Sequence, residues 1–219
     1  MVNLPKSYLS YSAWALWHKN KNQFRKRYYE NEPSFETRES IFGKRIAALL
    51  EEKKYDSTLA KVPRGKKTEF EINTHIGDIP ILCYLDSCTE KTKSLFEIKT
   101  GRIRWNQKRV NMHDQLVFYA MAIQARFGSY DPFTLLCWLE TELVGRKETI
   151  GGIDFENDDQ RDKLVQLTGR MMVWTRKITP RQINKMKKSV WQTAQEINND
   201  WEEWKKLSPA PVAIKDEIV

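Results

Sequence analysis

The chain has 219 residues, of which 40% are hydrophobic and 30% charged, with eight Trp, eight Tyr and nine Phe. This length suits one domain with a substantial core, and the composition excludes a disordered or collagen-like chain. No window approaches 18 consecutive apolar residues and the N-terminus lacks a secretory signal, so we expect neither a membrane span nor export. Three cysteines without a CxxC spacing predict reduced thiols in a cytoplasmic protein.

The positive charge of the chain is concentrated in its first third. The net charge is +8, and residues 1–67, with 15 Lys or Arg against 7 Asp or Glu, hold all of this excess. A one-sided basic surface favours a polyanionic partner, most simply nucleic acid. An ordinary solvated surface would have the same composition, so charge alone leaves both interpretations open.

Two helices are predicted before the first strand. Residues 5–30 carry an aromatic-rich apolar stripe typical of a helix, and residues 33–38 interrupt it. A second helix is predicted over 37–54, and Gly43 within it suggests close packing because glycine otherwise weakens a helix. The polar and basic stretch 55–67 is predicted to be a loop.

Strand patterns follow the second helix. Residues 68–76 alternate polar with apolar, a Gly-Asp turn follows, and 79–86 is a mostly apolar run, so the two predict a hairpin. Another apolar strand is expected over 94–100. A basic loop is expected over 101–111.

The remaining chain predicts mainly helices. A helix is expected over 112–127, a buried strand over 132–142, and an edge strand or hairpin partner over 144–154. Helices are then predicted over 158–177 and 181–206.

The order of these elements predicts an α/β fold with a mixed central sheet flanked by helices. We expect residues 1–207 to form one domain. Residues 208–219, which include two prolines, are expected to form a flexible tail.

One group of residues points to chemistry. Asp86 ends a predicted strand, and Glu97 and Lys99 lie two residues apart on the next, so they share a face. Two close carboxylates repel unless a cation binds them, and Mg²⁺ prefers oxygen ligands. A neighbouring lysine can orient or activate a water, so the group predicts metal-assisted hydrolysis of a phosphodiester. Glu97 and Lys99 alone would equally suit a surface salt bridge.

The wider context resembles the PD-(D/E)xK nuclease superfamily, in particular its RecB-like and phage recombination exonuclease branch. The matching segments are YLD at 84–86, FEIKTG at 96–101 and QLVFY at 115–119, after a glycine-containing helix at Gly43 and the phrase YLSYS at 8–12. The resemblance covers about residues 7–127 and implies a restriction-endonuclease-like core. It also implies a metal-dependent DNA exonuclease acting in recombination, repair or phage DNA processing.

The resemblance implies roles for individual residues. Asp86, Glu97 and the Ile98 carbonyl would bind Mg²⁺ or Mn²⁺, and Lys99 would position or activate the water. Relatives often carry a metal-binding His four residues after the helix glycine. That position is Ala47 here. Glu51 one turn later is the first candidate ligand in its place, and Glu39 is the second. Some relatives hold an iron–sulfur cluster on four cysteines, and the three scattered cysteines predict that this chain holds none.

Further residues are expected to contact DNA. Gln115 would contact a phosphate or orient Lys99, and the hydroxyl of Tyr119 would reach the edge of the site. The loop after the catalytic strand could clamp phosphates, and Trp105 within it could stack on an unpaired base. The cations of this loop are Arg102, Arg104, Lys108 and Arg109.

Two rival functions remain open from the sequence. One is a catalytically inactive nuclease-fold protein that binds nucleic acid or a protein partner, which the Ala47 position favours. The other is a site-specific endonuclease, which would cut a circular substrate. Partners other than DNA could be further copies of the chain or a recombination protein.

Overall fold

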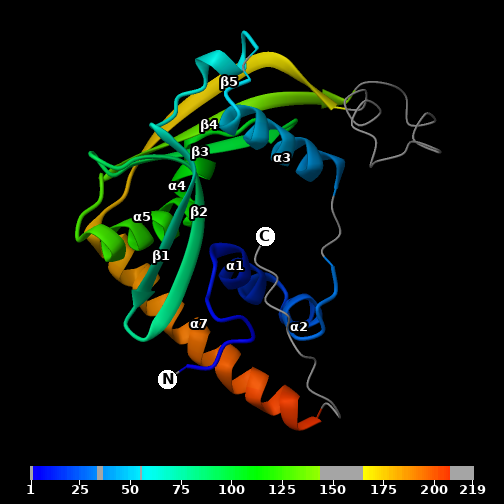
Figure 1. The fold of residues 1–219 in the computed structure, drawn as a ribbon, viewed down its shortest axis with the longest axis vertical. Coiled ribbons are helices and arrows are strands. Elements are labelled where there is room, and N and C mark those ends of the chain that lie inside the picture. The colour runs from blue at the N-terminus through cyan, green and yellow to red at the C-terminus, as the bar shows by residue number, and fades with distance from the viewer. Residues whose placement is uncertain (1, 34–36, 55, 144–164, 208–219) are drawn as a thin grey trace, which may run out of the picture.

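The computed structural model describes residues 2–33, 37–54, 56–143 and 165–207. Five strands form one sheet with the order β1-β2-β3-β4-β5, in which β3 and β4 are parallel and the other neighbouring pairs are antiparallel. The mixed sheet with helices on both faces confirms the predicted α/β fold class (Figure 1). The strands are β1 (Lys67–Ile76), β2 (Ile79–Thr89), β3 (Ser94–Gly101), β4 (Phe133–Leu143) and β5 (Val165–Lys177).

Different helices cover the two faces of the sheet. The face with Cys137 and Leu139 packs against α3 (Arg38–Glu51) and the short 3₁₀ helix η1 (Leu59–Lys61). The opposite face holds the larger core, which includes α5 (Asp114–Phe127) and α7 (Pro180–Leu207). Because both faces of the sheet are apolar and must be buried, the fold has three layers, with helices on each side of the sheet.

The predicted helix over 5–30 is two helices, α1 (Tyr11–Lys19) and α2 (Lys21–Tyr28). The chain is extended at Asn20, with φ −162° and ψ 95°, and the Asn20 side chain accepts a hydrogen bond from the Gln23 N–H at 3.0 Å. Asn20 therefore ends one helix and caps the next. An asparagine favours such a cap because its side chain competes for main-chain donors.

The predicted helix over 158–177 is wrong for its described part, because residues 165–177 form β5. This strand pairs along β4 and completes the sheet. The apolar residues of this segment follow neither a helical nor an alternating pattern. The segment forms a strand because it can hydrogen-bond to the edge of β4. The expected strand over 144–154 and the tail 208–219 lie outside the described residues, so the domain boundaries stay a prediction.

The predicted loop over 101–111 contains a short helix, α4 (Gln107–Asn111), which Asn106 caps by accepting from the Arg109 N–H at 2.8 Å. The helix expected over 112–127 is confirmed as α5. All residues from Leu116 to Ile123 are buried, so α5 lies inside the molecule between the sheet and α7.

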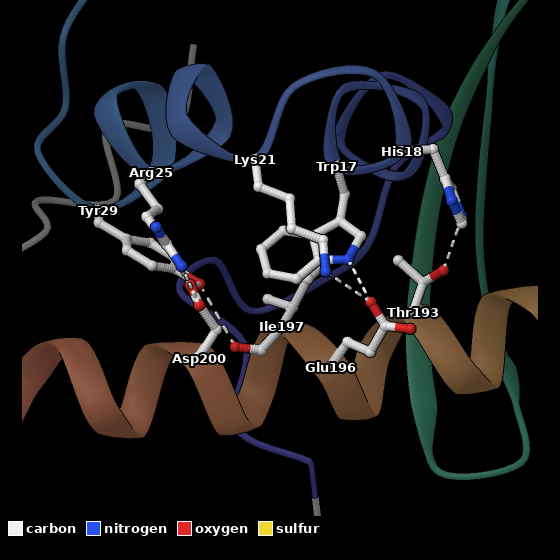
Figure 2. A network of polar contacts seen from close by, with 9 residues as sticks. All are labelled: Trp17, His18, Lys21, Arg25, Tyr29, Thr193, Glu196, Ile197 and Asp200. Carbon is white, nitrogen blue, oxygen red and sulfur yellow. Dashed lines mark hydrogen bonds and ion pairs between the residues drawn. The ribbon is translucent and has the colours of Figure 1, made fainter.

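The last helix, α7, presents two stripes to its neighbours. Ile183, Met186, Val190, Ala194 and Ile197 are buried at helical spacing and join the main core. A second, polar stripe on α7 makes hydrogen bonds with α1, with α2 and with Tyr29, which follows α2 (Figure 2). The N-terminal helices are thereby held on the same face as α5. No helix within the described ranges is long and apolar enough to cross a membrane.

Candidate active site

Asp86 lies where β2 bends between its two neighbours. Leu85 and Cys88 both belong to the main core although three positions separate them, so the alternation of faces breaks around Asp86. The recorded pairing of β2 with β3 ends at Ser87. There the Asp86 Oδ2 accepts a hydrogen bond from the Ile98 N–H at 2.6 Å, which ties its carboxylate to β3.

Glu97 and Lys99 lie on the face of β3 that is turned towards α5. The Lys99 Nζ is 2.5 Å from the Glu97 Oε1 and donates to the Gln115 Oε1 at 2.9 Å. The Gln115 Nε2 in turn donates to the Tyr119 hydroxyl at 2.8 Å. The structure thus brings together the sequence-predicted Glu97, Lys99, Gln115 and Tyr119 in one hydrogen-bonded chain from β3 to α5.

The charges of the site act on one another. Burial raises the pKa of the Glu97 carboxyl to about 7, and the Asp86 carboxylate adds to this rise. Burial likewise raises the pKa of Asp86. Burial alone would lower the pKa of Lys99, but the Glu97 and Asp86 carboxylates outweigh it and raise that pKa above its ordinary value. Lys99 is therefore a partly buried cation that contacts Glu97 and lies close to the charge of Asp86.

A cavity of about 490 Å³ opens beside Asp86 and Lys99, between the sheet and α3. A side chain at Gly43 would bring its Cβ within 3.2 Å of the Thr100 Oγ1, so this glycine lets α3 approach β3, as its position in the helix predicted. Ala47, where the family pattern has a histidine, lines the cavity without offering a polar atom. Glu51 is exposed and does not line the cavity.

Sequence reasoning missed two residues near this site. Glu69 on β1 lines the same cavity as Asp86, and only the pairing of β1 with β2 brings it there. Tyr11 on α1 lies with its ring 6.3 Å from that of Tyr119, and it lines a second cavity of about 320 Å³ that also reaches Gln115. The phrase YLSYS was noted as a motif, but its place beside Gln115 depends on the docking of α1.

The residues present fit a divalent cation. The Glu97 side chain is 1% exposed, its Oε1 contacts the Lys99 ammonium, and its Oε2 has no hydrogen-bond partner among the described residues. A buried carboxylate oxygen without a partner is costly unless it meets a cation or a proton. Carboxylate oxygens such as those of Glu97 and Asp86 are ligands that suit Mg²⁺ or Mn²⁺. No three Asp, Glu, His or Cys side chains in the described part of the chain already form a metal-binding group.

The predicted DNA-binding cations all follow β3 in the chain. All four are exposed in the segment from Gly101 to α4: Arg102, Arg104, Lys108 and Arg109. Trp105 differs from expectation, because it is buried against His113 with ring centroids 4.9 Å apart, and Arg109 covers its ring at 4.0 Å. In this conformation Trp105 packs the segment onto α5 and leaves no free ring face for a base.

Comparison with solved structures identifies the class of fold. A putative exonuclease from Eubacterium rectale has a TM-score of 0.54 at 7% identity, covering 89% of this chain and 82% of that chain. LHK-Exo, the alkaline exonuclease from Laribacter hongkongensis, in complex with dAMP has a TM-score of 0.50 at 10% identity, covering 93% of this chain and 94% of that chain. No protein-family model matches the chain, and no curated protein matches it in sequence.

The chain therefore has the fold of these exonucleases. It is the kind of fold that the motifs around Asp86, Glu97 and Lys99 led us to expect.

Proposed function

We propose that the chain is a metal-dependent deoxyribonuclease that hydrolyses phosphodiester bonds from DNA ends. The observation that carries the proposal is the Lys99 ammonium, held between Glu97 and Gln115 beside the carboxylate of Asp86. The shared fold with exonucleases supports the reaction class. The dAMP bound by LHK-Exo supports a deoxynucleotide product.

Each side chain of the site would have a separate role in such a reaction. Asp86, Glu97 and the Ile98 carbonyl would hold Mg²⁺ or Mn²⁺, which when bound neutralises charge on the scissile phosphate. Lys99, whose ammonium contacts the Glu97 Oε1 and donates to the Gln115 Oε1, would orient the attacking water and stabilise developing negative charge. Gln115 fixes the direction of the ammonium, since its amide accepts from Lys99 and donates to Tyr119.

The substrate strand would lie along the exposed cations that follow β3. Each of these side chains can pair with a phosphate without reading a base, which suits an enzyme that degrades any sequence. Arg102 lies 3.4 Å from Glu39 on the rim of the cavity, so the basic segment and the cavity are adjacent. A role in recombination, repair or phage DNA processing, and assembly with further copies or a recombination protein, belong to the same proposal.

The proposal is tested with end-labelled linear DNA and closed circular DNA of the same sequence. Incubation with Mg²⁺ or Mn²⁺ is expected to release mononucleotides from the linear form alone, and a chelator is expected to stop the release. Cleavage of the circle would instead indicate an endonuclease. Binding of linear DNA without cleavage under any metal would indicate the inactive nuclease fold.

A further inference from the structure

Acidic residues occupy one level of the sheet on three consecutive strands. In the β1–β2 register, the residues on either side of Glu69 pair with those on either side of Asp86, so Glu69 lies across from Asp86. On the other side of β2, the pairing with β3 ends at Ser87 and Phe96, one residue short of Asp86 and Glu97. Glu69, Asp86 and Glu97 therefore follow one another across the sheet where its regular pairing is interrupted.

The backbone of Glu69 departs from that of a regular strand. Its φ is +45°, in the left-handed region that residues other than glycine rarely adopt, and it makes no recorded ladder pair with Asp86. Its side chain forms part of the cavity wall together with Asp86, Ile98 and Lys99. Glu69 thus faces the space that a cation bound by Asp86 would occupy.

The other acids near the cavity are less well placed. Glu39 lines the cavity but lies 3.4 Å from the Arg102 guanidinium, on the side of the basic segment. Glu51 is exposed and lies off the cavity wall. Ala47, the position on α3 where the family pattern has a histidine, lines the cavity but has no side-chain ligand atom.

A cation at this site needs oxygen ligands beyond the two predicted carboxylates. One Asp86 oxygen is already engaged by the Ile98 N–H, and one Glu97 oxygen contacts Lys99. The remaining Glu97 oxygen is buried without a hydrogen-bond partner. Mg²⁺ and Mn²⁺ favour octahedral oxygen coordination. A third carboxylate, from a side chain that can turn into the cavity, would complete the set of ligands that the protein provides.

We propose that Glu69 is this third ligand, so that β1 supplies the ligand that α3 lacks at Ala47, where the family pattern has a histidine. The proposal rests on the metal-dependent function above and adds a residue to it. No three Asp, Glu, His or Cys side chains of the described residues already form a metal-binding group, so the exposed Glu69 side chain would have to turn towards Asp86 when the cation binds.

The test measures metal binding directly, by isothermal titration calorimetry of DNA-free full-length protein with MnCl₂. Glu69→Gln keeps the size of the side chain and is expected to weaken Mn²⁺ binding by at least roughly tenfold, since loss of even an outer partner weakens metal sites by this much. Glu71→Gln, two residues along the same strand and also exposed, is the matched control and is expected to bind like wild type. Thermal unfolding without metal checks that each variant folds.

Two further variants, Asp86→Asn and Glu51→Gln, show whether a negative result contradicts the role of Glu69 or the proposed function. Weak binding by Asp86→Asn together with wild-type binding by Glu69→Gln would overturn the role of Glu69 and leave the proposed function standing. Weak binding by Glu51→Gln but not by Glu69→Gln would assign the ligand to α3 and also overturn it. Absence of Mn²⁺ binding by the wild-type protein would overturn both proposals.

Discussion

Lys99 is the residue on which the proposed chemistry most depends. Its ammonium is enclosed by Glu97 and Gln115, and it stays charged because burial is outweighed by two carboxylates. A lysine in this state acts through its charge and its direction.

Replacement of Lys99 by Met keeps the length of the side chain and removes its charge. We expect Lys99→Met to lower the cleavage rate by at least roughly 100-fold, because a preorganised charge acts mainly in the transition state. DNA affinity should change by less than about threefold, since binding is spread over many phosphate contacts. The exposed Lys91 on the β2–β3 turn provides a control, and Lys91→Met should leave both quantities unchanged. Undiminished cleavage by Lys99→Met would contradict the assigned role.

The partly buried His113 leads to a separate prediction about how the free energy of unfolding depends on pH. Burial lowers the pKa of His113 to about 4, and the nearby Lys99 ammonium adds to the effect. The unfolded chain, with a histidine pKa of about 6.5, therefore binds more protons at intermediate pH. The contribution of the neutral ring is complete above about pH 6.5 and is lost as the pH falls towards 4.

The free energy of unfolding of the wild-type protein should thus fall more between pH 7 and pH 5 than that of His113→Phe. The expected difference is on the order of 1–2 kcal/mol, measured by urea denaturation at each pH. His75, which is exposed on β1, provides the control, and His75→Gln should follow the wild-type profile. Parallel profiles for the wild type and His113→Phe would show that His113 does not contribute to the pH dependence.

At the scale of elements, α7 fastens the N-terminal helices to the rest of the fold (Figure 2). Asp200 is the central acceptor, because its Oδ2 receives the Arg25 Nε at 2.9 Å and the Tyr29 hydroxyl at 3.0 Å. The Asp200 Oδ1 is in close contact with the Arg25 Nη2, which makes the pair bidentate. Hydrogen bonds from Arg25 hold the pKa of Asp200 below its usual range.

Asp200→Ala is expected to lower the free energy of unfolding by about 1–3 kcal/mol, because it leaves Arg25 and Tyr29 without their shared acceptor. Glu90→Ala, which removes the ion pair with Lys67, should cost less than about 1 kcal/mol, since Glu90 and Lys67 are both about half exposed. Urea denaturation of the two variants at pH 7 gives the comparison. Equal losses would mean that the bidentate contact adds nothing beyond a surface ion pair.

The contribution of the Asp200 carboxylate also depends on pH. Since its folded pKa is lowered, its stabilisation is present above the unfolded value of about 3.9 and disappears as the pH falls through the folded value. The difference between wild type and Asp200→Ala should therefore shrink in strong acid.

At the scale of the whole molecule, the positive charge is expected to guide DNA to the site. The segment after β3 contributes exposed cations close to the cavity rim, and each phosphate contact adds about 0.7 to the salt slope for single strands or 0.9 for duplex DNA. Substituting all four with Ala should therefore weaken binding and flatten the slope by up to about three units. The substituted residues are Arg102, Arg104, Lys108 and Arg109.

The control variant removes four positive charges from α7, which packs on the sheet face opposite to α3. Its substitutions to Ala are at the exposed residues Arg181, Lys185, Lys188 and Lys206. DNA affinity measured at several salt concentrations should give the control the wild-type slope. An identical slope for both fourfold variants would remove the basic segment from the DNA-binding surface.

The sequence alone determined the parts of the molecule that depend on local geometry. Glu97 and Lys99 share a face because strand side chains alternate, and that follows from two-residue spacing. The hairpin of β1 and β2, the strand β3 and the helix α5 were predicted because turn residues and hydrophobic periods mark them directly. The order of motifs around Asp86 then indicated the class of fold that the comparisons support.

Only the tertiary structure decided which residues meet across long stretches of chain. The strand β5 forms because β4 needs a partner, although its own pattern was interpreted as a helix. Trp105 is buried because α4 and α5 fold over it, and Glu69 reaches the cavity because β1 pairs with β2 beside Asp86. Such contacts arise from the packing of whole elements, and packing depends on surfaces that no local window of sequence contains.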